Sequence, residues 1–108
     1  MRERLERAKA RLDRVDLYPE PVRLEGVRVL VVPRLFGLPG VRRRDGYALG
    51  HTILVARADA SDDLLTHELC HVWQTQHRPL ATWLAWFRFS YRDNPFEIEA
   101  RRAVELTR

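Results

Sequence analysis

The chain has 108 residues, of which 45% are apolar and 31% charged, a globular composition that excludes repeat, collagen-like and low-complexity architectures. The charged residues 1–7 cannot serve as a signal peptide, and the longest apolar stretch, residues 79–87, is shorter than the roughly 20 residues needed to cross a bilayer. We therefore expect one domain over residues 1–108 without a membrane span. The single cysteine, Cys70, favours a cytoplasmic location.

Residues 1–21 are predicted to hold an N-terminal helix. The apolar residues of positions 2–16 recur at the spacing of an amphipathic helix: Leu5, Ala8, Leu12 and Val15. The sequence Tyr18-Pro19-Glu20-Pro21 then ends the helix, because proline lacks the amide N–H that would continue it.

Residues 22–57 are predicted to form the sheet. Residues 22–32 are rich in β-branched side chains and are followed by a proline, which indicates a first strand. Glycines, a proline and the Asp45-Gly46 pair make residues 34–46 a loop or hairpin connection, and residues 47–57 follow as a second strand. We expect two or three strands in all.

Residues 61–77 are predicted to form a central helix. Ser61 is a favourable N-cap, and Asp62 and Asp63 place negative charge at the positive end of the helix dipole. The helix is expected to reach about Gln76, so the histidine-containing segment lies near its middle.

Residues 79–108 are predicted to form two C-terminal helices, the first of which, residues 79–91, is apolar on nearly all sides. Asn94 as N-cap and Pro95 at the first helical position begin the last helix, which runs to about Thr107. Four aromatic residues are more than a domain of this size can bury, so some should line a groove or a self-association surface: Trp83, Trp86, Phe87 and Phe89. The order of elements predicts an α+β fold, with a small sheet packed on helices.

The segment His67-Glu68-Leu69-Cys70-His71 has the pattern H-E-x-x-H, which shuffling of this composition yields only about 0.01 times. Residues four apart share a helix face, so His67 and His71 can present ring nitrogens to one zinc ion. Glu68, next to the first histidine, can face the metal-bound water and act as general base. The pattern therefore predicts a zinc site on the central helix.

A catalytic zinc normally has three protein ligands, and three candidates for the third follow the motif. His77 lies ten residues after His67, but Gln74 stands where a glycine would turn the chain, and an unbroken helix carries His77 about 15 Å along its axis. Glu97 and Glu99 lie about 200° apart on the last helix, so at most one can reach the metal. The apolar stripe of this helix lies only slightly nearer to Glu97, so periodicity leaves the choice open. The alternative roles are a helix-capping acid for Glu97 and an exposed surface acid for Glu99.

Residues 64–74, LLTHELCHVWQ, resemble the active-site helix of small zincin-like metallopeptidases of the gluzincin type, which often reads L-x-H-E-L-x-H-V-x-Q. Residues 94–100, NPFEIEA, are similar to the second signature of these proteins, P-x-E-x-E-A, in which the first Glu supplies the third ligand. The resemblance covers roughly residues 50–104. It implies a zincin-like minimal domain, Zn²⁺ as cofactor, and Glu97 as the ligand beside the two histidines.

The resemblance also implies hydrolysis of peptide bonds in a peptide or protein substrate. Zinc would activate a water, Glu68 would accept its proton, and the resulting hydroxide would attack the peptide carbonyl. Tyr91 and His77 are the available donors for stabilising the oxyanion. Residues 51–56 could bind an extended substrate along a free strand edge.

Two alternatives belong to other classes of function. A zinc-bound but inactive domain could serve as a protein-interaction module through the aromatic residues 83–89, although Glu68 favours the enzyme because a structural zinc needs no general base. The net charge of +4 and the run Arg42, Arg43 and Arg44 permit a nucleic-acid-binding module or a DNA-associated protease. Short runs of charge usually lie in solvated loops, which disfavours the nucleic-acid interpretation.

Overall fold

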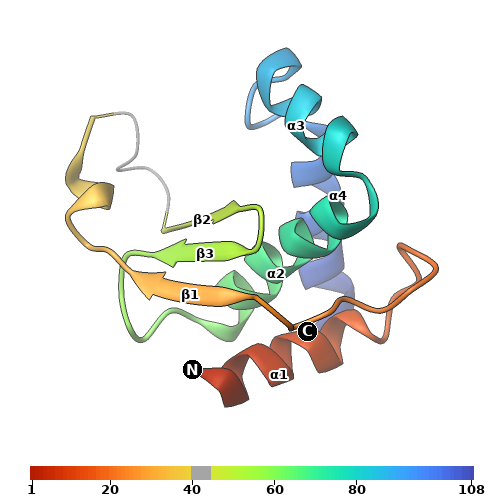
Figure 1. Cartoon of the computed structure of the whole chain (residues 1–108), viewed down its shortest axis with the longest axis horizontal. Helices are drawn as coiled ribbons and strands as arrows, with labels where there is room; N and C mark the ends of the chain where they lie inside the picture. Colours follow the sequence, from red (N-terminus) through yellow and green to blue (C-terminus); the bar gives the residue numbers. More distant parts are fainter. Residues whose placement is uncertain (40–44) are drawn as a thin grey trace.

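The computed structural model describes residues 1–39 and 45–108. Within them the chain forms one helix, three strands and three further helices, with a short 3₁₀ helix after the first strand (Figure 1). Their bounds are α1 (Arg2–Leu12), β1 (Arg28–Val31), the 3₁₀ helix (Leu35–Gly37), β2 (Gly46–Leu49), β3 (Thr52–Val55), α2 (Asp62–His77), α3 (Pro79–Arg88) and α4 (Pro95–Thr107). The predicted α+β class is confirmed.

The three strands form one mixed sheet in the order β1-β3-β2. β1 runs parallel to β3, whereas β2 runs antiparallel to it, with Ala48 opposite Ile53. The prediction of a single strand over residues 47–57 is wrong, because Gly50 and His51 form a two-residue turn between β2 and β3. Gly50 has a φ of 62°, a left-handed conformation that glycine adopts without steric strain and that tight hairpin turns require.

The two N-terminal elements are shorter than predicted. α1 ends at Leu12 rather than near residue 16, because the amide groups of Arg14 and Val15 bond to carbonyls three residues back and form a tight turn. β1 begins at Arg28 rather than at residue 22, and Val22 and Leu24 enter the core from a loop. Burial of these side chains therefore does not require the backbone around them to join the sheet.

The three C-terminal helices begin where the sequence predicts. The side chains of Ser61 and Asn94 each accept a hydrogen bond from an amide in the first turn of α2 and α4, respectively. α3 ends earlier than predicted, at Arg88 rather than Tyr91, because the backbone of Phe89 is extended. Helix starts are thus predicted better here than helix ends.

α2 is the central element of the fold and packs against α1, α3, α4 and the sheet. Leu65 and Leu69 of α2 are fully buried in one hydrophobic cluster with Leu12 of α1 and Ile53 of β3. Each such side chain contributes about 1.5–3 kcal/mol through burial of apolar surface. α3 stands away from the sheet and from α1 (Figure 1). Across the described residues, no helix is both long and apolar enough to cross a membrane.

Candidate metal centre

His67 and His71 lie one turn apart on the same face of α2. Their ring centroids are 4.8 Å apart and their Nε2 atoms 3.2 Å apart, so the two rings present the same nitrogen to one point. Leu65 and Leu69, about 200° around the helix from these two histidines, are fully buried in the core. The packing that holds α2 therefore also sets the direction of the two rings.

Glu97 reaches the same point from α4. Asn94 caps this helix and Pro95 occupies its first position, which places Glu97 in the first turn. Glu97 is only 7% exposed. Its Oε2 atom lies 3.3 Å from Nε2 of His67, and its Oε1 atom lies 2.5 Å from Nε2 of His71. The structure thus brings together the three side chains that the sequence suggested as ligands.

The donor atoms of this cluster fit a zinc ion. Two imidazole nitrogens and a carboxylate oxygen form one of the ligand sets of catalytic zinc, and here the three atoms lie within 4.8 Å of one another. Bonds of about 2.0–2.1 Å in a tetrahedron separate the donors by about 3.3–3.4 Å. The separations of 3.2 Å between the two Nε2 atoms and 3.3 Å from His67 to Oε2 of Glu97 agree with this. Oε1 of Glu97 lies closer than this to Nε2 of His71, at 2.5 Å.

The three side chains also interact through their charges. Burial acts to raise the pKa of Glu97, but hydrogen bonds from His67 and His71 outweigh it and hold that pKa well below its usual range. Burial acts to lower the pKa of His71, but the hydrogen bond and charge of Glu97, together with the charge of Glu68, raise it. Glu97 is therefore ionised, the form in which a carboxylate binds a metal.

A fully buried glutamine, Gln74, contacts Nδ1 of His71, the ring nitrogen that is not directed at Glu97 and His67. Its Oε1 atom lies 2.7 Å from Nδ1 of His71. Its Nε2 atom lies 2.8 Å from the carbonyl oxygen of Phe96 and 3.0 Å from Oε1 of Glu99. Tyr18 donates a hydrogen bond of 2.7 Å to the same oxygen of Glu99. These roles were not predicted from the sequence. The three-residue spacing from His71 could have indicated Gln74, but no local pattern connects Tyr18 with this site.

The two other candidate ligands have different environments. Glu99 does not take the exposed surface position that was the alternative to a ligand role, because it is half-buried and accepts hydrogen bonds from Gln74 and Tyr18. His77 ends α2 and stacks on Tyr18, with ring centroids 5.1 Å apart and ring planes 7° apart. Neither residue belongs to the three-residue cluster.

Glu68 is buried beside the cluster. Its Oε2 atom lies 3.2 Å from the position that a Cβ atom at Gly46 would occupy, so the missing side chain of Gly46 makes room for the carboxylate. Glu68 also lines both cavities that open next to the histidines. This position suits a residue that must reach both the metal and a substrate.

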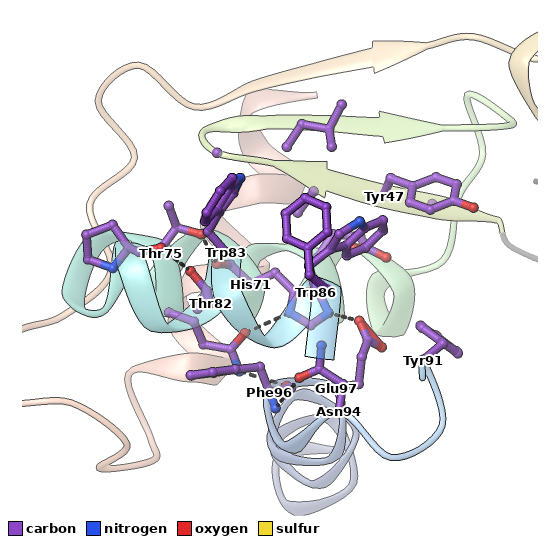
Figure 2. A pocket seen from close by; sticks show the side chains of 18 residues that line it. Tyr47, His71, Thr75, Thr82, Trp83, Trp86, Tyr91, Asn94, Phe96 and Glu97 are labelled. Atoms are coloured by element: carbon purple, nitrogen blue, oxygen red, sulfur yellow. Dashed lines mark hydrogen bonds and ion pairs between the residues drawn. The ribbon is translucent and has the colours of Figure 1, made fainter. Parts of the chain in front are cut away.

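Two cavities meet at the cluster. The larger, about 430 Å³, lies between β2, α2 and α3 and is lined by His71 (Figure 2). The second, about 390 Å³, is lined by His67. Gly46, Glu68 and Tyr91 line both, so the two cavities adjoin at these three residues beside the candidate metal centre, and together they are called the groove. Tyr91, predicted to stabilise an oxyanion, thus lies where the cavities join.

One wall of the larger cavity is aromatic. Trp83, Trp86 and Phe87 of α3 line it although they are 60%, 55% and 70% exposed. Figure 2 shows Trp83 and Trp86 between the ribbon of α2 and strand β2, which bears Tyr47. Phe89 is 39% exposed. The prediction that these aromatic side chains cannot all be buried, and that some line a groove, is confirmed.

Comparisons of this chain with protein-family models, with curated proteins and with solved structures give no match. The resemblance to gluzincin-type metallopeptidases in the two motifs therefore stays a hypothesis. The position of His67, His71 and Glu97 around one point and the groove beside them are the observations on which a function can be proposed.

The strand that borders the groove is β2. The prediction that residues 51–56 offer a free strand edge is wrong, because β3 is the central strand and pairs with β1 and β2. β2 is the outer strand on the groove side of the sheet within residues 1–39 and 45–108, and all four of its residues line the larger cavity. The edge next to the metal cluster therefore belongs to β2.

Two predictions concern residues away from the groove. Arg42, Arg43 and Arg44, the predicted nucleic-acid surface, lie outside the described residues. Cys70, which was taken to favour a cytoplasmic location, is fully buried, and burial raises the pKa of its thiol. It is therefore protonated and unreactive in the folded chain.

Proposed function

We propose that the chain is a zinc-dependent peptidase with a zincin-like fold, in which His67, His71 and Glu97 hold the ion and Glu68 is the general base. The observation that carries this proposal is the position of Glu68, a second buried carboxylate that lines both cavities beside the two-histidine, one-carboxylate cluster. A structural zinc normally has four protein ligands and needs no neighbouring base. Among the described residues the cluster has three ligands, which leaves one position for a water or a substrate.

The residues around the cluster have separate roles in this proposal. When bound, zinc would lower the pKa of its water to about 7 and polarise a peptide carbonyl. Glu68 accepts the proton of the attacking water and passes it to the amine that leaves. Gly46 sets the space that the Glu68 carboxylate occupies. Tyr91, at the junction of the cavities, donates a hydrogen bond to the oxygen that gains negative charge.

The groove supports a peptide substrate with a large apolar side chain near the scissile bond. An extended peptide can pair with the edge of β2, and its side chains then point alternately towards and away from the groove. Trp83, Trp86 and Phe87 offer an apolar wall beside His71. Large exposed apolar patches are rare on soluble proteins, and where they occur they often mark a binding surface.

The exposed residues of α3 also support the alternative of a zinc-bound but inactive interaction module. Leu80 and Leu84 are 66% and 50% exposed and extend the apolar surface of α3 along the helix. A cleavage assay on apolar peptides separates the two proposals, because only the enzyme releases new amino termini. A stable complex without cleavage would favour the module.

The first test is the metal content of the protein. We expect the wild-type chain to bind one equivalent of Zn²⁺ by elemental analysis, and the double variant His67→Ala, His71→Ala to bind none, because two of three ligands are removed. His51→Ala is the matched control, since His51 is exposed in the turn between β2 and β3 and should leave the zinc content unchanged. Unchanged zinc in the double variant would contradict the proposed centre.

A further inference from the structure

A partly buried chain of hydrogen bonds connects the candidate metal centre with the N-terminal part of the protein. It runs from His71 through Gln74 and Glu99 to Tyr18, which follows α1 in the sequence. Gln74 is fully buried, and the ring of Tyr18 packs edge-on against Trp73 with centroids 5.3 Å apart. The chain of bonds thus has a fully buried residue, Gln74, at its centre and joins three segments distant in sequence.

The partners of Gln74 determine the direction of these hydrogen bonds. One end of its amide faces two groups that can only accept, the carbonyl oxygen of Phe96 and the carboxylate of Glu99, so that end is the NH₂ group. The other end is then the amide oxygen, which faces Nδ1 of His71. An amide oxygen cannot donate, so Nδ1 of His71 carries the proton. The nitrogen left for a metal is Nε2, which points to Glu97 and His67.

The same glutamine also positions the third ligand. Phe96, whose carbonyl oxygen accepts from Gln74, is the residue before Glu97 in the first turn of α4. One buried side chain on α2 therefore holds the ring of His71 directly and holds the backbone next to Glu97. Loss of Gln74 would release a ligand on each of the two helices.

Glu99 and Tyr18 hold Gln74 in this orientation. The Oε1 atom of Glu99 accepts from Gln74 and from the hydroxyl of Tyr18, so the carboxylate is fixed by two donors. Burial, together with the hydrogen bond to Glu99, raises the pKa of Tyr18, and its hydroxyl therefore stays a donor. The carboxylate in turn keeps the NH₂ group of Gln74 facing away from His71.

We propose that Gln74, Glu99 and Tyr18 are positioning residues of the metal centre, which hold His71 in the tautomer that binds zinc through Nε2 and thereby raise the zinc affinity. This inference rests on the proposed metal centre. It adds Tyr18 to the site, a residue that lies outside both sequence motifs. Replacement of such outer partners of a ligating histidine typically lowers metal affinity by about 10–100-fold.

The experiment compares two glutamines on α2. Gln74→Leu removes every side-chain hydrogen bond of Gln74, whereas Gln76→Leu removes the two bonds that the Gln76 side chain makes with the backbone of Arg23 and leaves the ligands untouched. We expect Gln74→Leu to weaken zinc binding by about 10–100-fold in competition with a chromophoric chelator. Gln76→Leu should lower the unfolding temperature but not the zinc affinity.

A spectroscopic measurement distinguishes positioning from a general loss of stability. In the zinc-loaded protein, the proton on Nδ1 of His71 should give a slowly exchanging ring N–H resonance, because its partner Gln74 is fully buried. The resonance should be lost in Gln74→Leu and persist in Gln76→Leu. Tyr18→Phe, which keeps the ring and removes only the hydroxyl, should show a smaller loss of affinity.

A paired exchange keeps the proposal testable even if Gln74→Leu does not fold. Gln74→Glu retains an acceptor for His71 but sets a second carboxylate against Glu99, so zinc binding should fall. The addition of Glu99→Gln restores a donor facing the new carboxylate and should recover affinity relative to Gln74→Glu alone. Absence of zinc binding in the wild-type chain would overturn both the metal centre and this inference. If the wild-type chain binds zinc, and Tyr18→Phe, Gln74→Glu and the double variant Gln74→Glu, Glu99→Gln all bind it with the same affinity, the inference alone is overturned.

Discussion

Helices α2 and α3 follow each other in the chain, yet they depart from the usual relation between polarity and burial in different ways. α2 buries polar side chains, among them Glu68 and Gln74, whereas α3 exposes Trp83, Trp86 and Phe87. α3 buries only Ala85 among its ten residues. Buried polar groups and exposed apolar patches are the two deviations from ordinary packing that most often mark a functional surface.

Both deviations occur around the same groove. The buried polar residues of α2 form its floor, and the exposed aromatic residues of α3 form its wall. Burial of Glu68 and Gln74 is unfavourable unless their polar atoms have partners or a function. Exposure of Trp83 and Phe87 forgoes the free energy that burial would give. In the proposed function, residues of α2 therefore carry out the chemistry and residues of α3 bind the substrate.

The largest expected effect concerns the floor of the groove. Glu68→Gln should slow peptide cleavage by about 10²–10⁴-fold, because the amide cannot accept the proton of the attacking water. Zinc content should remain at one equivalent, since Glu68 is not among the three ligands. Elemental analysis and a peptide cleavage assay check both statements, with Glu25→Gln on an exposed loop as control. Cleavage at the wild-type rate would remove Glu68 from the mechanism.

A second pair of substitutions compares how the two helices contribute to stability. Leu69→Ala on α2 should reduce the free energy of unfolding by about 2–5 kcal/mol, because Leu69 is fully buried. Leu84→Ala on α3 should change it by no more than about 0.5 kcal/mol, because Leu84 is half exposed. Urea unfolding of both variants measures the difference. Equal losses would mean that α3 belongs to the core as much as α2 does.

A smaller effect is expected at the aromatic wall. Trp83→Ala combined with Trp86→Ala should raise KM for peptides with a large apolar side chain by about tenfold, because the proposed binding surface is removed. KM for peptides with small side chains should change less, and the unfolding free energy should stay close to that of the wild type. Steady-state kinetics on the two peptide sets provide the measurement. An equal rise in KM for both sets would argue against a specificity wall.

The sequence predicted those parts of the fold and site that depend on short-range signals. Ser61 and Asn94 cap their helices as expected, and the i, i+4 spacing of His67 and His71 places their rings together. The hairpin at Gly50 was missed, because the apolar residues on both sides read as one continuous strand. β-branched content indicates extended backbone but does not show where a strand turns.

The parts that were not predicted depend on contacts between distant segments. Tyr18 and Glu99 are 81 positions apart, and no periodicity relates them. Periodicity also left the choice between Glu97 and Glu99 open, because both are within reach of α2 once α4 is in place. The structure gives them different neighbours: Glu97 contacts the two histidines and Glu99 contacts Gln74.

The central claim is that one zinc ion binds between α2 and α4, and a crystal structure of the zinc-soaked protein with anomalous scattering at the zinc edge tests it most directly. We expect a single anomalous peak with Nε2 of His67, Nε2 of His71 and a carboxylate oxygen of Glu97 at about 2.0–2.2 Å. An ion coordinated by Glu99 or His77 at that distance, or no ion between the two histidines, would contradict the account.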